Sequence, residues 1–403
     1  MEALRLRKEP VLSLSKEAIV REVVIVEAVR TPMGRKQGVL SGIHPNNLGA
    51  MVLNEVVRRA GIESSMVEDV VFGCVDQVGE QGANVARNVL LTGDFPYEVP
   101  GTTVDRQCGS SQQAIHFAAN LIQAGTCDIT IGGGVESMSR VPLGVNIMQG
   151  PGFPFHPELV SKYELTPQGI SAEEIASKWG IERPEADEFA LESYEKAKQA
   201  RDEGRFDREI LPVDVKLEGL PATIKTDEGI RDTSLEKLAS LQPSFRPDGV
   251  HHAGNSSQIT DGAAALLLMA SEKAQELGLK ARARIIGQAV VGSDPVLMLT
   301  GPITATPKVL AKAGLKLSDI DLIEINEAFA SVPLAWKREV NPDMSKVNVN
   351  GGAIALGHPL GATGARLMTT LLHELERTGG RYGMQLMCCG GGLGTATIIE
   401  RLD

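Results

Sequence analysis

The same succession of secondary-structure signals occurs twice along the chain, at residues 102–134 and again at residues 347–392. In each copy a strand-like run leads into a turn, and a helical pattern follows that ends at a glycine, Gly125 or Gly379. An apolar strand comes next and runs into three consecutive glycines. A repeated strand–helix unit predicts an α/β protein made of two similar halves. The carboxyl ends of the strands, where α/β sheets bind ligands, would then meet at one cleft.

The stretch between the two copies differs in character from both of them. Residues 143–246 are charged and interrupted by prolines, and no alternating strand pattern of any length occurs there before residue 208. We therefore expect an inserted loop domain that lies over the α/β core. The predicted division is an N-terminal extension at 1–20, a first half at 21–142 plus 247–285, the loop domain at 143–246 and a second half at 286–403.

The overall composition limits the classes of partner. With 42% hydrophobic and 23% charged residues, the 403-residue chain can bury a sizeable core. Its formal net charge of −11 argues against nucleic acid, which binds to a basic face. The apolar run at 263–270 is far shorter than the ~20 residues that a membrane-spanning helix needs, so no membrane span is expected.

The cysteines indicate a reducing compartment. The chain has 5 cysteines, an odd number, and none of their spacings resembles a zinc site. We therefore expect free thiols, with neither a disulfide framework nor a structural metal. Residues 1–20 carry both basic and acidic side chains and no long apolar stretch, so no secretory signal is visible. A cytoplasmic location follows as the expectation.

Cys108 lies where a strand pattern turns into a helix. The run at 102–104 is β-branched throughout, and apolar residues at helical spacing follow from Ala114 to Ile122. Unpaired N–H groups and the positive end of the helix dipole favour a thiolate at such a position. Cys108 is therefore a candidate nucleophile. The alternative is that it is one more small buried hydrophobic residue.

Three turns in the second half each carry a chemically useful side chain. Asn326 follows a strand pattern, His358 lies in the loop before a helix, and Cys388 ends the last buried strand. Each also has an ordinary interpretation. A histidine in a turn is usually a solvent or capping residue, a cysteine at a strand end usually packs in the core, and an asparagine at a turn usually bonds its own backbone.

Taken together, these motifs resemble those of the thiolases, cysteine-dependent enzymes that cleave or form carbon–carbon bonds in acyl-CoA compounds. The resemblance spans roughly residues 21–402 and implies a five-layered αβαβα core of two similar halves with a loop domain inserted in the first. The motifs that carry it, in the order of the family, are Cys108-Gly109-Ser110, the GGVESMS run at 133–139, Gly254-Asn255-Ser256-Ser257, the NEAFA run at 326–330, the GGAIALGHP run at 351–359 and Cys388-Cys389-Gly390-Gly391-Gly392.

The resemblance implies a role for each catalytic candidate. Cys108 matches the nucleophile that becomes acylated, and Cys388 matches the second cysteine, an acid and base. His358 matches the histidine that activates the nucleophile and helps bind the thioester oxygen, and Asn326 matches the residue that holds a water in the same oxyanion hole. The N–H groups of Gly390 and Cys108 match the donors of a second hole. Cys389, between Cys388 and Gly390, is expected to be a bystander.

Further positions match substrate contacts. Ser257 corresponds to a contact with the pantetheine arm, and Phe329, inside the Asn326 motif, belongs to the same expected substrate site. Arg231, in the loop domain, is a weaker match to a residue that contacts a phosphate of coenzyme A. The resemblance implies coenzyme A as a co-substrate, no permanently bound cofactor or metal, and a homodimer or homotetramer.

The sequence departs from the family pattern at two places. Ser111 stands where much of the family has glycine, which would reshape the floor of the pocket. Gln258 replaces a glycine of the biosynthetic branch, so the chain looks more like the degradative 3-ketoacyl-CoA thiolases, including those that act on long-chain or steroid side-chain substrates. The expected function is thiolytic cleavage of 3-ketoacyl-CoA in fatty-acid or related lipid degradation.

Three alternatives stay open at this point. The first is a short-chain acetyl-CoA acetyltransferase that forms acetoacetyl-CoA, and the second is a non-catalytic acyl-CoA or lipid carrier on the same fold. A carrier would be expected to have lost Cys108, His358 or Cys388, and none is lost. The third, a ketoacyl synthase, would lack the second cysteine. The neighbouring pair His251 and His252 is expected to be exposed in a loop.

Overall fold

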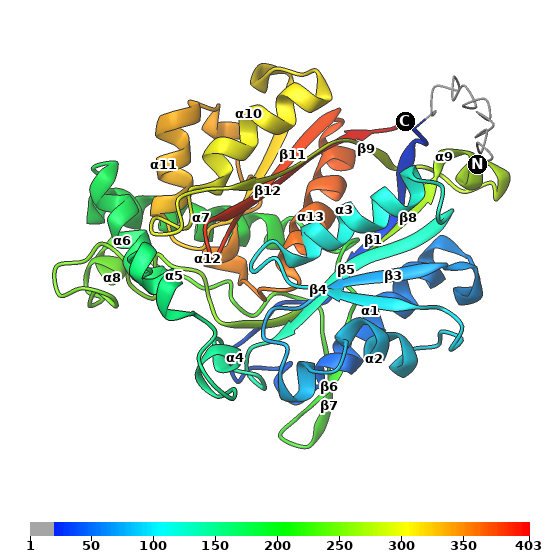
Figure 1. The fold of residues 1–403 in the computed structure, drawn as a ribbon, viewed down its shortest axis with the longest axis horizontal. Helices are drawn as coiled ribbons and strands as arrows, with labels where there is room; N and C mark the ends of the chain where they lie inside the picture. Colours follow the sequence, from blue (N-terminus) through cyan, green and yellow to red (C-terminus); the bar gives the residue numbers. More distant parts are fainter. Residues whose placement is uncertain (1–19) are drawn as a thin grey trace, which may run out of the picture.

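A computed structural model describes residues 20–403 of the chain, and the predicted extension at 1–20 lies outside this range except for its last residue. The strands form one 10-stranded sheet with a strand order of β10-β11-β12-β9-β1-β8-β5-β3-β4, and β2 pairs with β8 (Figure 1). The first half contributes β1 (Val23–Arg30), β2 (Gly34–Arg35), β3 (Asp69–Gly73), β4 (Gly101–Val104), β5 (Ile129–Ser137) and β8 (Thr260–Ala270). The second half contributes β9 (Ala283–Gly292), β10 (Leu322–Ile325), β11 (Tyr382–Cys389) and β12 (Leu393–Arg401).

The two halves repeat one strand pattern. In the first half β3 and β5 are parallel, and β8 then pairs antiparallel with both β5 and β1. In the second half β10 and β11 are parallel, and β12 pairs antiparallel with both β11 and β9. A short antiparallel pairing of β1 with β9, from Val24–Arg284 to Ile25–Ala283, joins the halves into one sheet. The predicted repeat is therefore confirmed.

One predicted strand is almost absent. Residues 347–349 correspond in sequence to β4, but only Val347 pairs, in a single parallel bridge with Ile323 of β10. Asn348 has a positive φ of 44°, which breaks the extended backbone. Its side chain takes the place of the missing ladder, because it accepts from the N–H of Ile325 at 2.8 Å and donates to the carbonyl of the same residue at 2.9 Å.

Helices complete the five layers. On the first half α1 (Pro45–Ala60) and α2 (Val85–Thr92) cover the outer face, and on the second half α10 (Gly301–Ala313) and α11 (Ser331–Val340) do so. Between the half-sheets, α3 (Ser110–Gln123) and α13 (Thr363–Thr378) pack against each other (Figure 1). Separate apolar clusters fill the two outer interfaces and the middle one. The sequence-based fold class is thus confirmed.

Glycines let other segments lie directly on strand β5. The three glycines at 132–134 belong to this strand, whereas the sequence had suggested a turn after it. A Cβ added at Gly132 would lie 2.7 Å from Cα of Ile115 in α3, and one at Gly134 would lie 2.0 Å from the carbonyl oxygen of Gly361. Any larger residue would push away α3 or the loop that carries His358.

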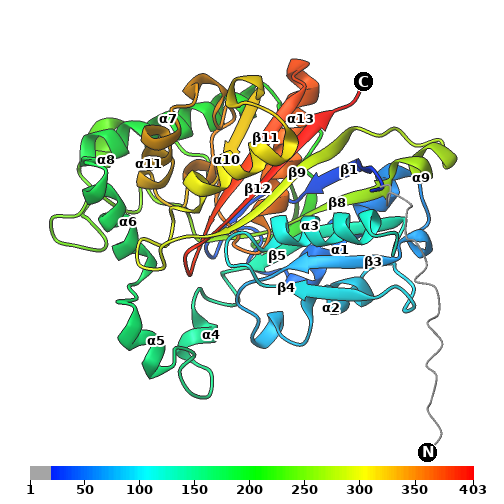
Figure 2. The same ribbon diagram turned by 45° about the horizontal axis from the view of Figure 1, so that its top comes forward.

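The inserted stretch contacts both halves: its helices α6 and α7 pack against α11 and α12 of the second half, whereas its hairpin packs against the core of the first half. Figure 2 shows its two short helices α4 and α5 at the outer side, away from the sheet. Its elements are α4 (Val145–Met148), α5 (Pro157–Lys162), α6 (Gln168–Lys178), α7 (Arg183–Asp202), the hairpin β6 (Val213–Leu217) and β7 (Leu220–Ile224), and α8 (Leu235–Ala239). Two other short helices are α9 (Ser271–Glu276) and α12 (Ala353–Leu356). Within residues 20–403 no helix is both long and apolar enough to cross a membrane.

Candidate active site

Cys108 lies in the turn between β4 and α3, as the sequence indicates, but its environment differs from the expectation. The side chain is only 3% exposed, and burial raises the pKa of its thiol to about 12, with the neighbouring Cys388 thiol acting in the same direction. The N–H of Gly390 opposes this shift. Burial therefore outweighs the start of helix α3, and the resting group is a thiol. A base is needed to make it a nucleophile.

The second cysteine lies beside the asparagine of the NEAFA motif. Cys388 is the residue before the last in β11, and its Sγ accepts from Nδ2 of Asn326 at 3.6 Å and lies 3.9 Å from the Asn326 carbonyl oxygen. Burial raises the pKa of the Cys388 thiol to about 11, and the bond from Asn326 opposes the shift. Cys388 is thus a buried thiol whose anion has a donor in place.

His358 carries its proton on a defined nitrogen. Its Nδ1 lies 2.6 Å from the hydroxyl of Thr363, and that hydroxyl donates its only proton to the carbonyl of Pro359 at 2.7 Å. Thr363 must therefore accept from Nδ1–H, which leaves Nε2 as the basic nitrogen. Nε2 lies 3.5 Å from Nδ2 of Asn326. Burial and the charge of Arg366 lower the pKa of His358 to about 3, so the resting ring is neutral.

The site is assembled from both halves of the fold. The first half supplies Cys108, and the second supplies Asn326 after β10, His358 in the loop before α13, and Cys388 with Gly390 at the end of β11. Cys389 packs on the other side of the turn, where a Cβ added at Gly109 would lie 2.7 Å from its Sγ. A thiol, a neutral imidazole, an amide and a second thiol gathered at one site can support nucleophilic acyl transfer with a proton relay.

Glu136 fixes the loop of His358 to the first half. Its buried carboxylate sits at the end of β5 and accepts hydrogen bonds from three segments of the chain. The donors are the N–H groups of Val75 (2.9 Å), Asp76 (3.1 Å) and Gly361 (2.8 Å) and the amide of Gln81 (2.6 Å). Since Gly361 lies in the turn just after His358 and Pro359, this carboxylate ties the loop of His358 to the segment that follows β3.

Ser111 connects the two central helices. It is completely buried, and its hydroxyl accepts from the N–H of Ala365 in the first turn of α13 at 2.9 Å. Ser111 therefore caps the neighbouring helix α13 from the side.

Ser111→Ala is expected to lower the free energy of unfolding by about 1 kcal/mol, because one N–H at the start of α13 loses its partner. Urea unfolding measured by circular dichroism tests this, with Ser177→Ala on the exposed side of α6 as the matched control. An unchanged urea midpoint for Ser111→Ala would contradict the capping role.

The residues expected to contact substrate lie along one edge of the site. The N–H of Ser257 donates to the carbonyl of Ala328 at 2.9 Å, and the preceding Ser256 bridges to Phe329. The ring of Phe329 is only 7% exposed and packs edge-on against Phe245 and His251. The structure thus brings Ser257 and Phe329 next to the Asn326 motif.

Arg231 lies on the loop domain with its side chain exposed. Its guanidinium donates to the hydroxyl of Tyr194 at 2.7 Å and lies over the ring of the same residue. Gln258 links this region to the core, because its amide donates to the carbonyl of Ile354 at 2.8 Å and to that of Gly229 at 3.2 Å. Arg231 is therefore held near the catalytic loops while its charge stays open to solvent.

The prediction that His251 and His252 are exposed is wrong. Both are completely buried, with His251 Nε2 2.8 Å from the hydroxyl of Ser331 and His252 Nε2 2.7 Å from a carboxylate oxygen of Asp187. A loop histidine can be buried when a polar partner meets each ring, and these partners come from distant helices. Sequence patterns near the histidines do not contain that information.

Gln168 lies at the site although no sequence motif marks it as a candidate. Gln168, the first residue of α6, directs its amide nitrogen at Sγ of Cys108 at a distance of 4.0 Å. It lies 60 residues further along the chain, in the inserted stretch. Nothing in its own segment of the sequence indicates that it faces Cys108.

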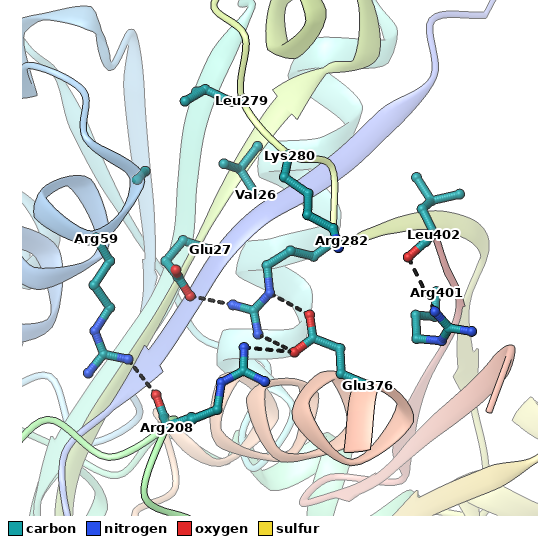
Figure 3. A pocket seen from close by; sticks show the side chains of 11 residues that line it. Val26, Glu27, Arg59, Arg208, Leu279, Lys280, Arg282, Glu376, Arg401 and Leu402 are labelled. Carbon is teal, nitrogen blue, oxygen red and sulfur yellow. Dashed lines mark hydrogen bonds and ion pairs between the residues drawn. The ribbon is translucent and has the colours of Figure 1, made fainter. Parts of the chain in front are cut away.

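A cavity of about 420 Å³ lies elsewhere, and none of the candidate site residues lines it (Figure 3). Arg282 is held there between Glu27 and Glu376, and Arg208 approaches Glu376 at 3.1 Å. Since the central cations are already paired with carboxylates, the cavity belongs to an ion-pair network between β1, the start of β9 and α13.

Comparison with known proteins identifies the family. Residues 23–272 match the description "Thiolase, N-terminal domain", and residues 279–401 match "Thiolase, C-terminal domain". The chain therefore belongs to the thiolase family, a family of acyltransferases, and the sequence-based assignments of family and enzyme class are confirmed.

Three relatives illustrate the similarity. A steroid 3-ketoacyl-CoA thiolase of Mycobacterium tuberculosis is 48% identical over 401 residues, which is 98% of this chain and 97% of the relative. A 3-ketoacyl-CoA thiolase of Bacillus subtilis is 43% identical over 94% of this chain and 99% of its own length. The crystal structure of the Bacillus anthracis acetyl-CoA acetyltransferase superposes with a TM-score of 0.88 at 42% identity, covering 95% of this chain and 99% of that one.

Proposed function

We propose that the protein cleaves 3-ketoacyl-CoA with coenzyme A to give acetyl-CoA, or another acyl-CoA, and a shortened acyl-CoA, in the degradation of fatty acids or related lipids. The observation that carries this proposal is that two buried thiols, Cys108 and Cys388, lie close together and that the amide of Asn326 links Cys388 to the neutral imidazole of His358. One thiol can hold the acyl group while the other moves a proton. The two 3-ketoacyl-CoA thiolases among the relatives support the same direction.

In the first half-reaction, Nε2 of His358 takes the proton of the Cys108 thiol, and the sulfur attacks the 3-keto carbon. The resulting oxyanion is stabilised by the N–H groups of Gly390 and Cys108, an arrangement that supplies several kcal/mol in other enzymes. The C2–C3 bond then breaks, and its electron pair goes to C2 as an enolate, whose oxygen binds His358 and the water held by Asn326. Cys388 gives its proton to C2, and acetyl-CoA leaves.

In the second half-reaction, Cys108 carries the shortened acyl group as a thioester. The Cys388 thiolate takes the proton of incoming coenzyme A, and the coenzyme A sulfur attacks the acyl carbon. The bond to Cys108 breaks, the shortened acyl-CoA leaves, and the proton on His358 returns to Cys108. Cys388 acts first as an acid and then as a base, so both of its protonation states are used.

The same proposal assigns the remaining residues. Ser257 contacts the pantetheine arm, Arg231 a phosphate of coenzyme A, and Phe329 the substrate beside the Asn326 motif. The exposure of the Arg231 side chain supports the proposed phosphate contact, because a phosphate can reach it from solvent. Coenzyme A is a co-substrate, and no cofactor is bound permanently. Residues 143–246 act as a loop domain between the two parts of the first half, 21–142 and 247–285, with 286–403 as the second half.

We also propose a homodimer or homotetramer in the cytoplasm. The 5 unpaired thiols support a reducing compartment, and the assembly rests on the resemblance to the family.

Substrate size can be tested directly. Apolar side chains pack around the nucleophile, among them Val75, Met138 and Leu360, and Gln258 belongs to the motif that resembles the degradative thiolases. We expect a kcat/KM at least about tenfold higher for 3-ketoacyl-CoAs of medium or longer chain than for acetoacetyl-CoA, because a longer acyl chain buries more apolar surface when it binds. Steady-state thiolysis across a chain-length series measures this. Activity on acetoacetyl-CoA alone would instead show a short-chain acetyl-CoA acetyltransferase.

A further inference from the structure

The amide of Gln168 is directed at the nucleophile from the inserted stretch. Its Nε2 lies 4.0 Å from Sγ of Cys108, and this is the hydrogen bond that its side chain makes within residues 20–403. Gln168 is half-buried, whereas Cys108 is 3% exposed, so a partly exposed side chain reaches a buried thiol.

The start of α6 is fixed in place, so Gln168 is not a free surface side chain. A Cβ added at the next residue, Gly169, would lie 2.1 Å from the ring of Phe245, which packs edge-on against Phe329 at 5.6 Å between ring centroids. The hydroxyl of Ser171 donates to the carbonyl of Val296 at 2.6 Å. These contacts anchor the first turn of α6 to the loop after β9 and, through Phe245, to the segment that follows Asn326.

An amide N–H group next to a sulfur favours the charged form. A neutral thiol is a weak acceptor, whereas a thiolate accepts strongly, so a donor lowers the free energy of the anion more than that of the thiol. Cys108 needs such help because its buried side chain has lost the water that would solvate a thiolate. The N–H groups of Gly390 and Cys108 are fixed donors on the backbone, and Gln168 adds a donor from a side chain.

We propose that Gln168 donates a hydrogen bond to the Cys108 thiolate and so eases the deprotonation that begins each turnover. The role rests on the proposed function, because it takes Cys108 as the nucleophile. It makes Gln168 a contact residue of the reacting sulfur, supplied by the inserted stretch and not by the α/β core.

The rate of alkylation of Cys108 by iodoacetamide, followed between pH 7 and pH 10, tests this role. Peptide mass analysis separates Cys108 from the other thiols. Gln168→Met keeps the length of the side chain and removes the donor. We expect alkylation to be about three- to tenfold slower throughout this pH range, because loss of the donor lowers the fraction of thiolate by that factor. Ser177→Ala, on the exposed side of α6, is the matched control and should behave as the wild type.

Two charged variants separate this role from a merely structural one. Gln168→Lys should speed alkylation and Gln168→Glu should slow it more than Gln168→Met does, since a cation favours and an anion disfavours the thiolate. Equal effects of both charges would show that α6 packing, not the donor, is responsible. A Gln168→Met rate within twofold of the wild type at every pH would overturn the proposal. Alkylation needs no 3-ketoacyl-CoA, so its outcome does not depend on the result of the thiolysis assay that tests the proposed function.

Discussion

Cys108→Ala is expected to lower thiolysis by roughly 10⁴-fold or more and to leave no acyl-enzyme, because the only atom proposed to hold the acyl group is removed. The fold should survive, since alanine fills most of the volume of the 3% exposed side chain. Two measurements are needed, steady-state thiolysis and the intact mass of the protein after incubation with an acyl-CoA. The wild type should gain one acyl group and the variant none.

Cys389→Ala is the matched control for this experiment. Cys389 is equally buried and adjacent to Cys388, but its sulfur packs against the Gly109 turn on the side away from Asn326. It should keep the acyl-enzyme and most of the activity. An acyl adduct on Cys108→Ala, or a complete loss of acylation in Cys389→Ala, would show that the nucleophile has been assigned to the wrong sulfur.

The fold was predictable because its signals are local and occur twice. Strand, turn and glycine-ended helix follow one another in both halves, and each is specified by the periodicity of its own segment. The shortened strand at Val347 was not predictable in the same way. There the side chain of Asn348 replaces backbone pairing, and this contact depends on β10 lying alongside.

The identity of the catalytic candidates could be read from the sequence, but their protonation states could not. The start of helix α3 suggested a thiolate at Cys108, yet burial by residues from both halves raises the pKa of the thiol to about 12. The basic nitrogen of His358 is set by the hydroxyl of Thr363, which is in turn committed to Pro359. The protonation states of Cys108 and His358 depend on contacts between residues that are distant in the sequence or that lie on opposite sides of a turn.

Residues of the inserted stretch were the hardest to interpret. The sequence marks 143–246 only by its prolines and charges, and it gives no sign that Gln168 faces a thiol that lies 60 residues earlier. For the same reason the burial of His252 against Asp187 of α7 was missed. Both contacts join the inserted helices to the core, where no periodicity relates the two partners.

Cys388→Ala is expected to separate the two chemical steps that the wild type combines. Cys108 and His358 are intact in this variant, so attack on an activated acyl thioester should still give the acyl-enzyme, visible by intact mass. Carbon–carbon cleavage should fall by roughly 10²- to 10⁴-fold, because no positioned group protonates C2 of the departing enolate. Exchange of the C2 hydrogens of acetyl-CoA with deuterium in the solvent should fall with it, since the same thiol moves both protons. Cys389→Ala again serves as the control, and it should retain exchange. If Cys388→Ala cleaved 3-ketoacyl-CoA at nearly the wild-type rate, the 3.6 Å contact with Asn326 would be structural, and the proton would have to reach C2 from Cys389 or a water.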